Sequence, residues 1–394
     1  MKNLETLIQE LCPDGVEFVK LGDILDYEQP TKYIVKCKDY QNEGMPVLTA
    51  GQTFILGYTD ETNGIFEASK ENPVIIFDDF TTSFHWVDFN FKVKSSAMKM
   101  LRVLSEREVL FRFVYYAMKC IKYQSLEHSR QWISKYSQIE IPLPPIEVQT
   151  EIVRILDKFT SLEAELEAEL DCRKRQYEYY RDKLLSFENV GGQEVEWKKM
   201  SEVGTFIRGK RFVRTDIVEE GVPCIHYGDI YTYYGLTATK AKTYLKPEKA
   251  EKMKFASKND VVIVGAGENN MDIGVGVAWL SDEEVAIHDA CYIFKSKMNP
   301  RFVSHYLRGS NYHLQIKKYV CEGKICSISS KSIGRSLIPV PSLSEQERIA
   351  NILDRFEALS TSLQSGLPAE IAARRQQYEH YRDKLLTFKR KGAA

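Results

Sequence analysis

The sequence predicts an α+β fold in which two divergent head domains are joined by two long antiparallel helices of the coiled-coil type, as a pseudo-twofold tandem repeat. Three observations predict it. One helical segment occurs twice with nearly the same sequence, each copy follows a longer stretch of mixed composition, and those stretches contain short β-like runs between turn residues. Two different heads on matching helices would present two different surfaces from one scaffold.

The repeat is clearest at the ends of the two helical segments. Residues 173–187 read RKRQYEYYRDKLLSF and residues 374–388 read RRQQYEHYRDKLLTF. Upstream, residues 141–159 and 338–356 share Ile-Pro-x-Pro, a Gln and Ile-Leu-Asp-x-Phe. Because a long internal repeat defines structural units, we divide the chain into two tandem units of similar plan, at roughly residue 190.

Apolar residues of the first helical segment follow steps of three and four from Ile152 to Leu184, the pattern of a coiled-coil seam. Pro144-Pro145 and Gly191-Gly192 flank this helix as start and stop signals. The second helix should begin at a capping box of Ser344 and Glu347, and the SGLP insertion at 365–368 should kink or break it. The expected domains are a head at 1–143, a helix at 144–190, a head at 191–340 and a helix at 341–394.

Within the heads, VIIF at 74–77 and DVVIV at 260–264 predict strands, and residues 106–121 predict a helix. We therefore expect each head to be an α+β domain with a strongly bent sheet.

Composition excludes several classes of protein. Hydrophobic residues make up 43% of the chain and charged residues 28%, the balance of a globular protein. Residues 1–15 hold no apolar signal core and no apolar run reaches membrane-spanning length, so we expect a soluble, cytoplasmic protein. The eight cysteines include no Cys-x-x-Cys pair, which argues against a zinc site. With a net charge of −1, any DNA binding must come from local basic faces.

The common catalytic motifs are missing. Pro144-Pro145 lacks the flanking residues of an adenine methyltransferase motif, and Asn270 stands where a dinucleotide-binding loop at Gly265–Gly267 would need its third glycine. Gly323-Lys324 lacks the rest of a phosphate-binding loop, Asp78-Asp79 lacks a nuclease lysine, and the seven histidines fit no triad. We therefore predict a non-catalytic protein with no catalytic residue, no metal and no cofactor of its own.

Basic and aromatic clusters are present instead. The segment GTFIRGKRFVR (204–214) holds four cations and no acid, which suits contact with phosphates and base edges, although a solvated loop has the same composition. Polar segments with cations also precede both helices, at 128–137 and 322–332. The predicted DNA-binding residues are Lys32, Thr81, Thr82, Arg130, Gln131, Lys135, Arg208, Lys210, Arg211, Arg214, Tyr227, Lys324 and Lys331.

The charged, aromatic tails of the two helices are nearly identical within one chain, which indicates that both do the same job. A solvated helix face is the plainer explanation, and docking of two copies of one partner is the explanation that we favour. The predicted partner-binding residues are Tyr177, Tyr180, Arg181, Tyr378, Tyr381 and Arg382.

These features resemble the specificity subunits of type I restriction–modification systems over essentially the whole chain. The resemblance rests on paired divergent heads, each followed by an Ile-Pro-x-Pro helix that ends in QYEYYRDKLLSF or its second copy. The first unit is similar to the type IC branch in particular. The segments that carry this similarity are YEQPTKYIV (27–35), VLTAGQTFILGYT (47–59), VIIFDDFTT (74–82) and the tandem tetrapeptide LEAELEAEL (162–170).

The resemblance implies that each head is a target recognition domain that reads one half of a bipartite double-stranded DNA site. It also implies that the helices set the spacer and dock two modification subunits, which bring S-adenosylmethionine and methylate adenine N6. Restriction subunits, where present, add translocation and cleavage with ATP and Mg. Two alternatives stay open. Activity of the chain alone would favour a self-sufficient methyltransferase or nuclease, and salt-independent failure to bind DNA would favour a coiled-coil adaptor for proteins.

Overall fold

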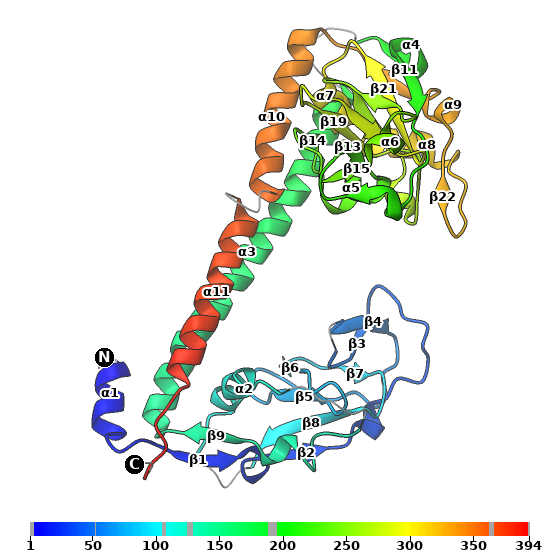
Figure 1. Cartoon of the computed structure of the whole chain (residues 1–394). Coiled ribbons are helices and arrows are strands. Elements are labelled where there is room, and N and C mark those ends of the chain that lie inside the picture. Colours follow the sequence, from blue (N-terminus) through cyan, green and yellow to red (C-terminus); the bar gives the residue numbers. More distant parts are fainter. Residues whose placement is uncertain are drawn as a thin grey trace. The chain divides into compact units, whose positions relative to one another are not determined.

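The computed structural model describes residues 4–51, 53–104, 108–123, 129–187, 195–361 and 366–392. The chain divides into two compact units (Figure 1). Unit 1 consists of residues 1–165 and 371–394, and unit 2 consists of residues 166–370. Each unit therefore contains one head together with parts of two different helical segments.

The head of unit 1 contains two main sheets and one core helix, α2 (Phe111–Lys119). The first sheet has the order β2-β8-β5-β6 and is antiparallel throughout. The second has the order β4-β3-β7, with β3 parallel to β7. The strand bounds are β2 Leu25–Glu28, β3 Met45–Leu48, β4 Ile55–Thr59, β5 Val74–Asp78, β6 Phe84–Val87, β7 Lys92–Val93 and β8 Met98–Val103, with β1 (Glu17–Lys20) and β9 (Glu140–Leu143) as a separate antiparallel pair.

The head of unit 2 also contains two main sheets. Their orders are β11-β21-β17-β19-β14 and β12-β15-β13-β20-β16, and two short pairs, β10-β23 and β18-β22, flank them. The strand bounds are β10 Trp197–Lys199, β11 Gly204–Arg208, β12 Ile217–Val218, β13 Val222–Ile225, β14 Thr237–Ala238, β15 Thr243–Leu245, β16 Phe255–Ala256, β17 Val261–Val264, β18 Ala266–Gly267, β19 Gly276–Trp279, β20 Val285–Ile287, β21 Cys291–Ser296, β22 Cys326–Ser327 and β23 Leu337–Pro339. The helices are α4 Met200–Val203, α5 Tyr227–Thr232, α6 Pro247–Ala250, α7 Pro300–Tyr306, α8 Ser310–Lys317 and α9 Ser330–Ile333.

The two heads share one backbone frame in spite of their different sequences. The order β2-β8-β5-β6 in unit 1 matches β11-β21-β17-β19 in unit 2, and the parallel pair β3-β7 matches β13-β20. The predicted strands at 74–77 and 260–264 form the interior strands β5 and β17, and every residue from Val261 to Val264 is buried. A fully apolar run of this length is typical of a strand that is covered on both faces. The predicted helix at 106–121 occupies Phe111–Lys119, residues 108–110 are not helical, and residues 106 and 107 lie outside the described residues.

The first helical segment is a single helix, α3 (Ile146–Ser186), and the second is divided into α10 (Leu343–Thr361) and α11 (Leu367–Leu385). Gly191-Gly192 and residues 362–365 lie outside the described residues. The predicted capping box at Ser344 is wrong, because α10 begins at Leu343 and the backbone N–H of Glu345 donates to Ser342 Oγ at 3.3 Å. The cap therefore lies two residues earlier than the sequence pattern suggested.

The helices pair in antiparallel fashion within each unit. In unit 1, the ring of Phe159 on α3 stacks on Tyr381 of α11 with centroids 5.5 Å apart, and Glu163 forms an ion pair with Arg375. In unit 2, Tyr180 on α3 stacks in the same way on Phe356 of α10, with centroids 5.4 Å apart. Since the partner number falls as the α3 number rises, the pairing is antiparallel, as the seam pattern predicted.

The tail that follows α11 closes the head of unit 1. The backbone N–H of Val16 donates to the carbonyl of Lys389, and the N–H of Lys391 donates to the carbonyl of Val16, both at 2.9 Å. Arg390 adds an ion pair with Glu140 of β9. Gly15 has φ +89°, and a Cβ there would lie 2.4 Å from the Lys389 carbonyl oxygen, so this close approach requires glycine. Residues 387–391 are thus structural parts of the first head.

Within the described part of the chain, no helix combines the length and the apolar character needed to cross a bilayer. All eight cysteines are free thiols, and four of them are buried.

Candidate nucleic-acid interface

The predicted basic loop of unit 2 is held in place by its backbone and not by its cations. At the end of β11, the N–H of Gly209 donates to the carbonyl of Cys291 at 3.1 Å, and the N–H of Lys210 donates to Ile287 at 2.9 Å. A Cβ on Gly209 would lie 2.2 Å from the His288 carbonyl oxygen, which explains the glycine between two cations. The loop is therefore clamped to the turn at 287–291.

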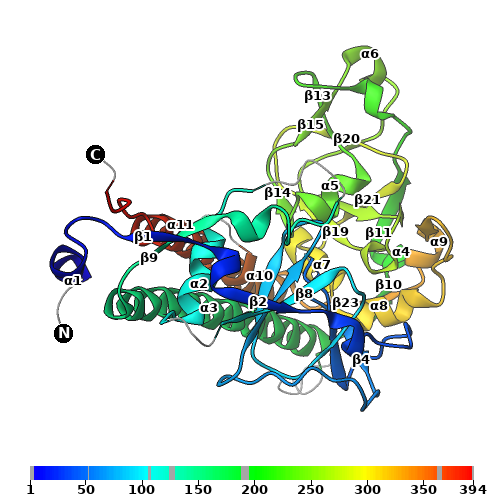
Figure 2. The same ribbon diagram turned by 90° about the horizontal axis from the view of Figure 1, so that it is seen from below.

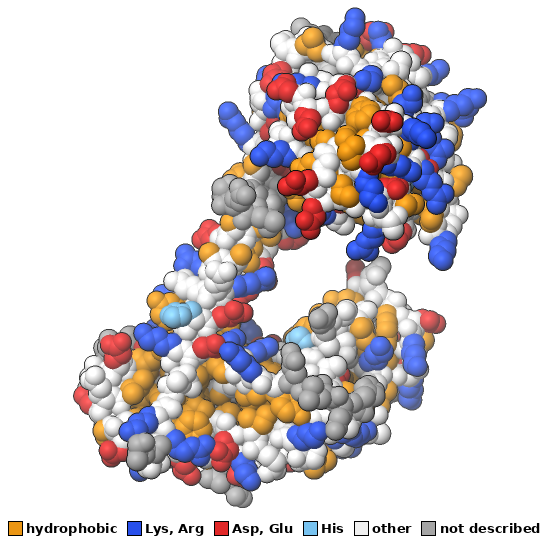
Figure 3. All heavy atoms as spheres, in the orientation of Figure 1, with side chains coloured by type: hydrophobic (Ala, Val, Ile, Leu, Met, Phe, Trp, Pro, Cys, Tyr) orange, Lys and Arg blue, Asp and Glu red, His pale blue; other side chains and the backbone are white. Residues whose placement is uncertain are grey.

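The cations of this loop face solvent. The side chains of Lys210, Arg211 and Arg214 are exposed, and Arg208 is exposed although its Nε donates to the Asp289 carbonyl at 2.9 Å. Figure 3 shows many Lys and Arg side chains on the side of unit 2 that carries α6, α8, α9 and β22. A firmly held backbone with exposed cations is suited to contact with phosphates and base edges.

Tyr227 lies in an aromatic cluster behind the basic loop. Its ring centroid is 4.4 Å from that of His226 and 5.6 Å from that of His288, and Phe212 contacts His288 edge-on at 4.8 Å. His288 Nε2 bonds to the Phe212 carbonyl at 3.2 Å, which ties the loop to the cluster. Burial lowers the pKa of both His226 and His288, so the cluster is uncharged near neutral pH.

A third segment continues this row of loops. The N–H groups of Gly265 and Ala266 donate to the carbonyl of Ala290, and β18 then pairs with β22, which follows the exposed Lys324. We call the row formed by residues 208–214, 287–291, 265–267 and 324–328 the unit 2 strip. Lys331 is also exposed, on α9, outside this row.

Unit 1 contains an equivalent row, formed by residues 28–33, 94–97, 78–83 and 129–132, which we call the unit 1 strip. The backbone bonds correspond: Asp79 N–H donates to Ala97 as Gly265 N–H donates to Ala290. Likewise, Gln131 N–H donates to the Asp79 carbonyl as Ile328 N–H donates to Gly265, each at 2.8 Å. The two segments before the helices therefore occupy equivalent places in the frame.

The candidate residues of the unit 1 strip differ in exposure. Lys32, Thr81 and Arg130 are exposed, and Lys32 forms an exposed ion pair with Glu28 at 3.5 Å. The predicted residue Lys135 is also exposed, but it lies three residues beyond the strip. Thr82 is 8% exposed and has φ +60° at the turn after β5. Gln131 is fully buried, where its amide group bonds to Tyr123 and Ser129. Thr82 and Gln131 therefore shape the strip, and the side chains of Lys32, Thr81 and Arg130 contribute to its surface.

A duplicated glutamine fixes each head to its helix. Gln149 on α3 accepts from the N–H of Leu110 at 2.9 Å and donates to the Pro144 carbonyl at 2.8 Å. Gln346 on α10 makes the same pair of bonds, to Asn299 and Pro341, both at 2.8 Å. Both glutamines are almost fully buried, so these bonds have no competition from water.

An arginine–aspartate pair repeats about two helical turns further on, eight residues after each glutamine. In unit 1, Arg112 Nε lies 2.8 Å from Asp157 of α3, which also accepts the hydroxyl of Tyr116. Figure 2 shows α2, which carries both Arg112 and Tyr116, beside the first turns of α3. In unit 2, Arg301 of α7 lies 2.5 Å from Asp354 of α10.

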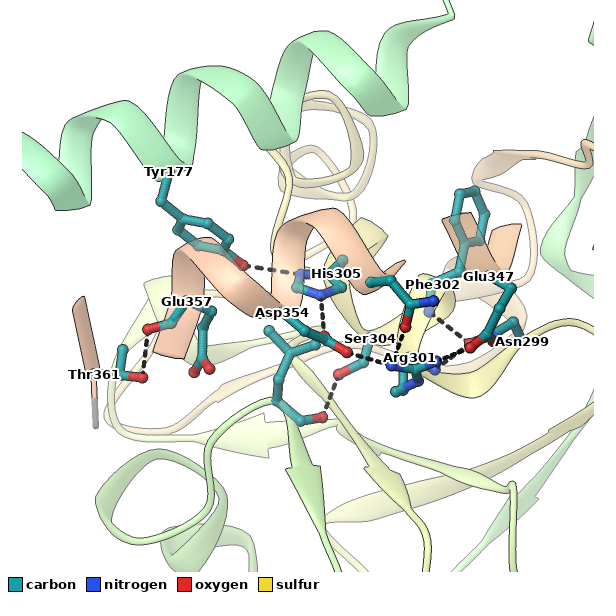
Figure 4. A network of polar contacts seen from close by, with 12 residues as sticks. Tyr177, Asn299, Arg301, Phe302, Ser304, His305, Glu347, Asp354, Glu357 and Thr361 are labelled. Carbon is teal, nitrogen blue, oxygen red and sulfur yellow. Dashed lines mark hydrogen bonds and ion pairs between the residues drawn. The ribbon is translucent and has the colours of Figure 1, made fainter. Parts of the chain in front are cut away.

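His305 takes the place of Tyr116 in unit 2. Its Nε2 lies 2.8 Å from Asp354, and its Nδ1 accepts the hydroxyl of Tyr177 from α3 at 3.0 Å, as Figure 4 shows. Burial lowers the pKa of His305, and Asp354 opposes this shift without cancelling it. Burial would raise the pKa of Asp354, but His305 and Arg301 outweigh it and the pKa is lowered. The histidine is therefore neutral and the aspartate charged near pH 7.

The duplicated helix tails pack against the heads. Tyr177 and Tyr378 are partly buried against the cores of units 2 and 1 respectively, and burial raises the pKa of each to about 12. The guanidinium of Arg181 lies 5.5 Å from the Tyr177 ring, and that of Arg382 lies 5.6 Å from the Tyr378 ring. Intramolecular packing thus accounts for part of the near-identity of the tails. Partner binding by Tyr177, Tyr180, Arg181, Tyr378, Tyr381 and Arg382 stays a prediction, for which Tyr180 and Tyr381 are the more exposed members, at 37% and 38%.

Two sets of residues escaped prediction. The head–helix pairs had a signal, because RFV occurs both at 112–114 and at 301–303, and the aspartates stand in the repeated Ile-Leu-Asp-x-Phe. The buried pair of Asp79 and Lys99, 3.6 Å apart in unit 1, has no such signal in the sequence. Its equivalents in unit 2 are Gly265 and Tyr292, so the pair is not repeated.

Comparison with known proteins decides the family. The model of the type I restriction modification DNA specificity domain matches residues 13–171 and 193–373, one match in each tandem half. The chain belongs to the type I restriction–modification specificity family. It is 44% identical over 409 residues to the Escherichia coli type I restriction enzyme EcoR124I/EcoR124II specificity subunit, covering 98% of this chain and 97% of the relative.

Further members of the specificity family agree with this assignment. A putative type I restriction enzyme specificity subunit of Haemophilus influenzae is 29% identical, with 98% of this chain and 100% of the relative covered. The solved specificity subunit of M. genitalium has the same fold, with a TM-score of 0.52 at 16% identity over 94% of this chain and 96% of that one. A structure from a study of the assembly and conformational transition of the type I system gives a TM-score of 0.56 at 17% identity, covering 95% and 98%.

Membership of the specificity family makes this chain a DNA-recognition subunit of a restriction–modification complex and not an enzyme in its own right. The two alternatives drawn from the sequence, a self-sufficient enzyme and a protein-binding adaptor, are therefore set aside. The specificity family is non-catalytic, and the absence of a cofactor in this chain stays a prediction.

Proposed function

We propose that this specificity subunit reads a bipartite DNA target, with one half-site for each head and with the helices setting the distance between the halves. The observation that carries the proposal is the equivalence of the two strips. The heads repeat one strand order and one set of backbone bonds, yet they place different side chains on the strip surface. A repeated frame with different surfaces is what two different half-sites require.

The proposed domains are a recognition head at 1–143, a spacer helix at 144–190, a recognition head at 191–340 and a second spacer helix at 341–394. The exposed parts of the helices, including Tyr180 and Tyr381, would dock two modification subunits. Those partners would supply S-adenosylmethionine and methylate adenine N6, and restriction subunits would supply ATP- and Mg-dependent cleavage. The complex would act on DNA in the cytoplasm.

The first test is single-molecule methylome sequencing of cells that carry this chain with its modification subunit, against cells that carry either one alone. A bipartite adenine-methylated motif that requires both is the expected result. If co-purification shows a stable complex but no bipartite motif appears, the proposal is wrong.

The basic loop gives a sharper version of the same test. Changing Arg208, Lys210 and Arg211 to Ala should weaken recognition of one half-site only, because all three lie on the unit 2 strip. Equal weakening of both half-sites would show that these residues make general phosphate contacts. Changing the exposed Lys258, which pairs with Asp282 away from the strip, to Ala is the matched control and should leave the motif unchanged.

The spacer can be tested through the tetrapeptide at 162–170. The division between the two compact units falls between Glu165 and Leu166, inside this repeat. A third LEAE copy would add about 6 Å of helix, a base-pair step or two along DNA. We expect a longer gap between unchanged half-sites, and altered half-site bases with an unchanged gap would contradict the spacer role.

A further inference from the structure

A buried carboxylate lies directly beneath the unit 1 strip. Asp79 follows β5 and is 1% exposed. Its Oδ1 accepts the N–H groups of Gln131 and Trp132 at 3.1 and 2.9 Å, which holds the segment before the helix. Its Oδ2 makes no hydrogen bond among the described residues, but it lies 3.6 Å from Lys99 Nζ and 4.0 Å from Arg130 Nε.

Burying the side chain of Lys99 at this place costs free energy. It is fully buried on β8, its Nζ has no hydrogen-bond partner among the described residues, and it lies 4.7 Å from the centroid of the Tyr27 ring. Burial lowers the pKa of Lys99, and Asp79 partly restores it. Since a buried ion pair is often no more stable than apolar side chains of similar volume, stability alone does not account for this pair.

Unit 2 shows that the shared frame does not need the charges. Lys99 pairs with Phe77 in the sheet of unit 1, as Tyr292 pairs with Ile263 in unit 2, and Gly265 stands in place of Asp79. The Tyr292 ring fills the vacated space, 2.4 Å from where a Cβ on Gly265 would lie. Its hydroxyl donates to the Ile328 carbonyl at 3.1 Å and so holds the segment before the helix. Unit 2 has no cation equivalent to Arg130, because Ser327 occupies that position.

We propose that Asp79 is a positioning residue for DNA recognition, which holds the half-exposed Arg130 in the orientation that contacts a guanine of the first half-site. The inference rests on the proposed function. With Nε beside Asp79, the two terminal nitrogens of the half-exposed guanidinium can form the fork that matches guanine O6 and N7 in the major groove. Lys99, buried beside the same oxygen, compensates the single negative charge of the Asp79 carboxylate inside the head.

The test compares four chains in the complete complex with the modification subunit, with methylome sequencing as the readout. They are the unchanged chain, Arg130→Ala, the double variant Asp79→Gly with Lys99→Tyr, and the combination of all three. The double variant places in unit 1 the glycine and tyrosine that unit 2 has at the equivalent positions, Gly265 and Tyr292. The first head should therefore stay folded. We expect it to lose discrimination at one base pair of the first half-site by about tenfold to a hundredfold.

Three further results are expected. Arg130→Ala should reduce discrimination at the same base pair. The triple variant should lose no more discrimination there than Arg130→Ala or the double variant does. Recognition of the second half-site should stay unchanged. If the double variant abolishes methylation at both half-sites, the variant Asp79→Asn with Lys99→Met, which keeps the bulk and removes both charges, should show the relaxed base pair instead.

The outcomes separate the two proposals. In one outcome, the double variant methylates DNA with unchanged discrimination at every base pair, while Arg130→Ala relaxes discrimination at one base pair. That result would overturn the positioning role and leave Asp79 a structural residue. No effect of Arg130→Ala would overturn the contact itself. Absence of a bipartite motif with the unchanged chain would overturn the proposed function, and that result is visible before any variant is made.

Discussion

The two heads hold the segment before each helix with different chemistry. Unit 1 uses the carboxylate of Asp79, which binds two backbone N–H groups beside a buried lysine. Unit 2 uses the hydroxyl of Tyr292, which binds one carbonyl above a glycine. The surrounding backbone bonds and the buried glutamines are the same in both. The comparison teaches that the frame constrains the place of each loop but leaves the side chains beneath the strip free to differ.

The largest loss of stability is expected when the buried aspartate of unit 1 is introduced at the equivalent position of unit 2. Gly265→Asp would place a Cβ against the Tyr292 ring and bury a carboxylate without a cation, which should cost about 3–5 kcal/mol. Hydrogen exchange of β17 and β21 measures the loss. Adding Tyr292→Lys should restore part of the protection from exchange. Normal protection in Gly265→Asp alone would show that single residues of the Asp79–Lys99 pair and of the Gly265–Tyr292 pair can be exchanged between the heads.

The glutamines test whether the two head–helix joints are equivalent. Gln149→Ala and Gln346→Ala each leave one buried N–H and one carbonyl unpaired, so each should destabilise its own unit by about 1–3 kcal/mol. Hydrogen exchange resolved by unit should show similar losses. A loss in unit 1 much larger than that in unit 2 would mean that the additional ion pair of Arg301 with Glu347 compensates for the missing glutamine.

Lowering the pH should destabilise the two units to different extents, and this difference should be smaller than the effects above. Burial lowers the pKa of His226, His288, His305 and His313 in unit 2, but of only His85 among the described residues of unit 1. A histidine whose folded pKa is lowered binds more protons when unfolded, so its unit loses stability as pH falls below the ordinary value of about 6.5. Protease susceptibility at pH 7.5 and 5.5 should therefore rise more in unit 2. His305→Tyr, which copies Tyr116, should narrow the difference, and equal sensitivity of both units would contradict it.

The smallest effect on stability is expected at exposed cations. Lys32→Ala removes only an exposed ion pair and should change unfolding free energy by less than about 1 kcal/mol. It should nevertheless lower the salt dependence of DNA binding by the complex, as should Arg211→Ala. Methylome sequencing should then assign the two losses to different half-sites. Loss at the same half-site would break the equivalence of the strips.

The sequence predicted the fold because its repeat is long and its helices are nearly duplicated. It also located the exposed basic loop at 208–214, whose composition is a local signal. It did not reveal the pairing of Asp79 with Lys99, which depends on strand register, or that of Arg112 with Asp157, which lie far apart in sequence. The tail at 387–391 was unforeseen for the same reason, because its backbone bonds to Val16 leave no pattern in either segment.

The composition of the two units has a consequence for the order of folding during synthesis. Unit 2 is built from one continuous stretch, residues 166–370, whereas unit 1 needs residues 371–391 to complete its helix pair and to bond with Val16. The head that leaves the ribosome first therefore waits for the last part of the chain, and the second head can finish before it. Until then, the apolar face of α3 around Phe159 lacks its Tyr381 partner, so the nascent first head exposes a surface that favours aggregation.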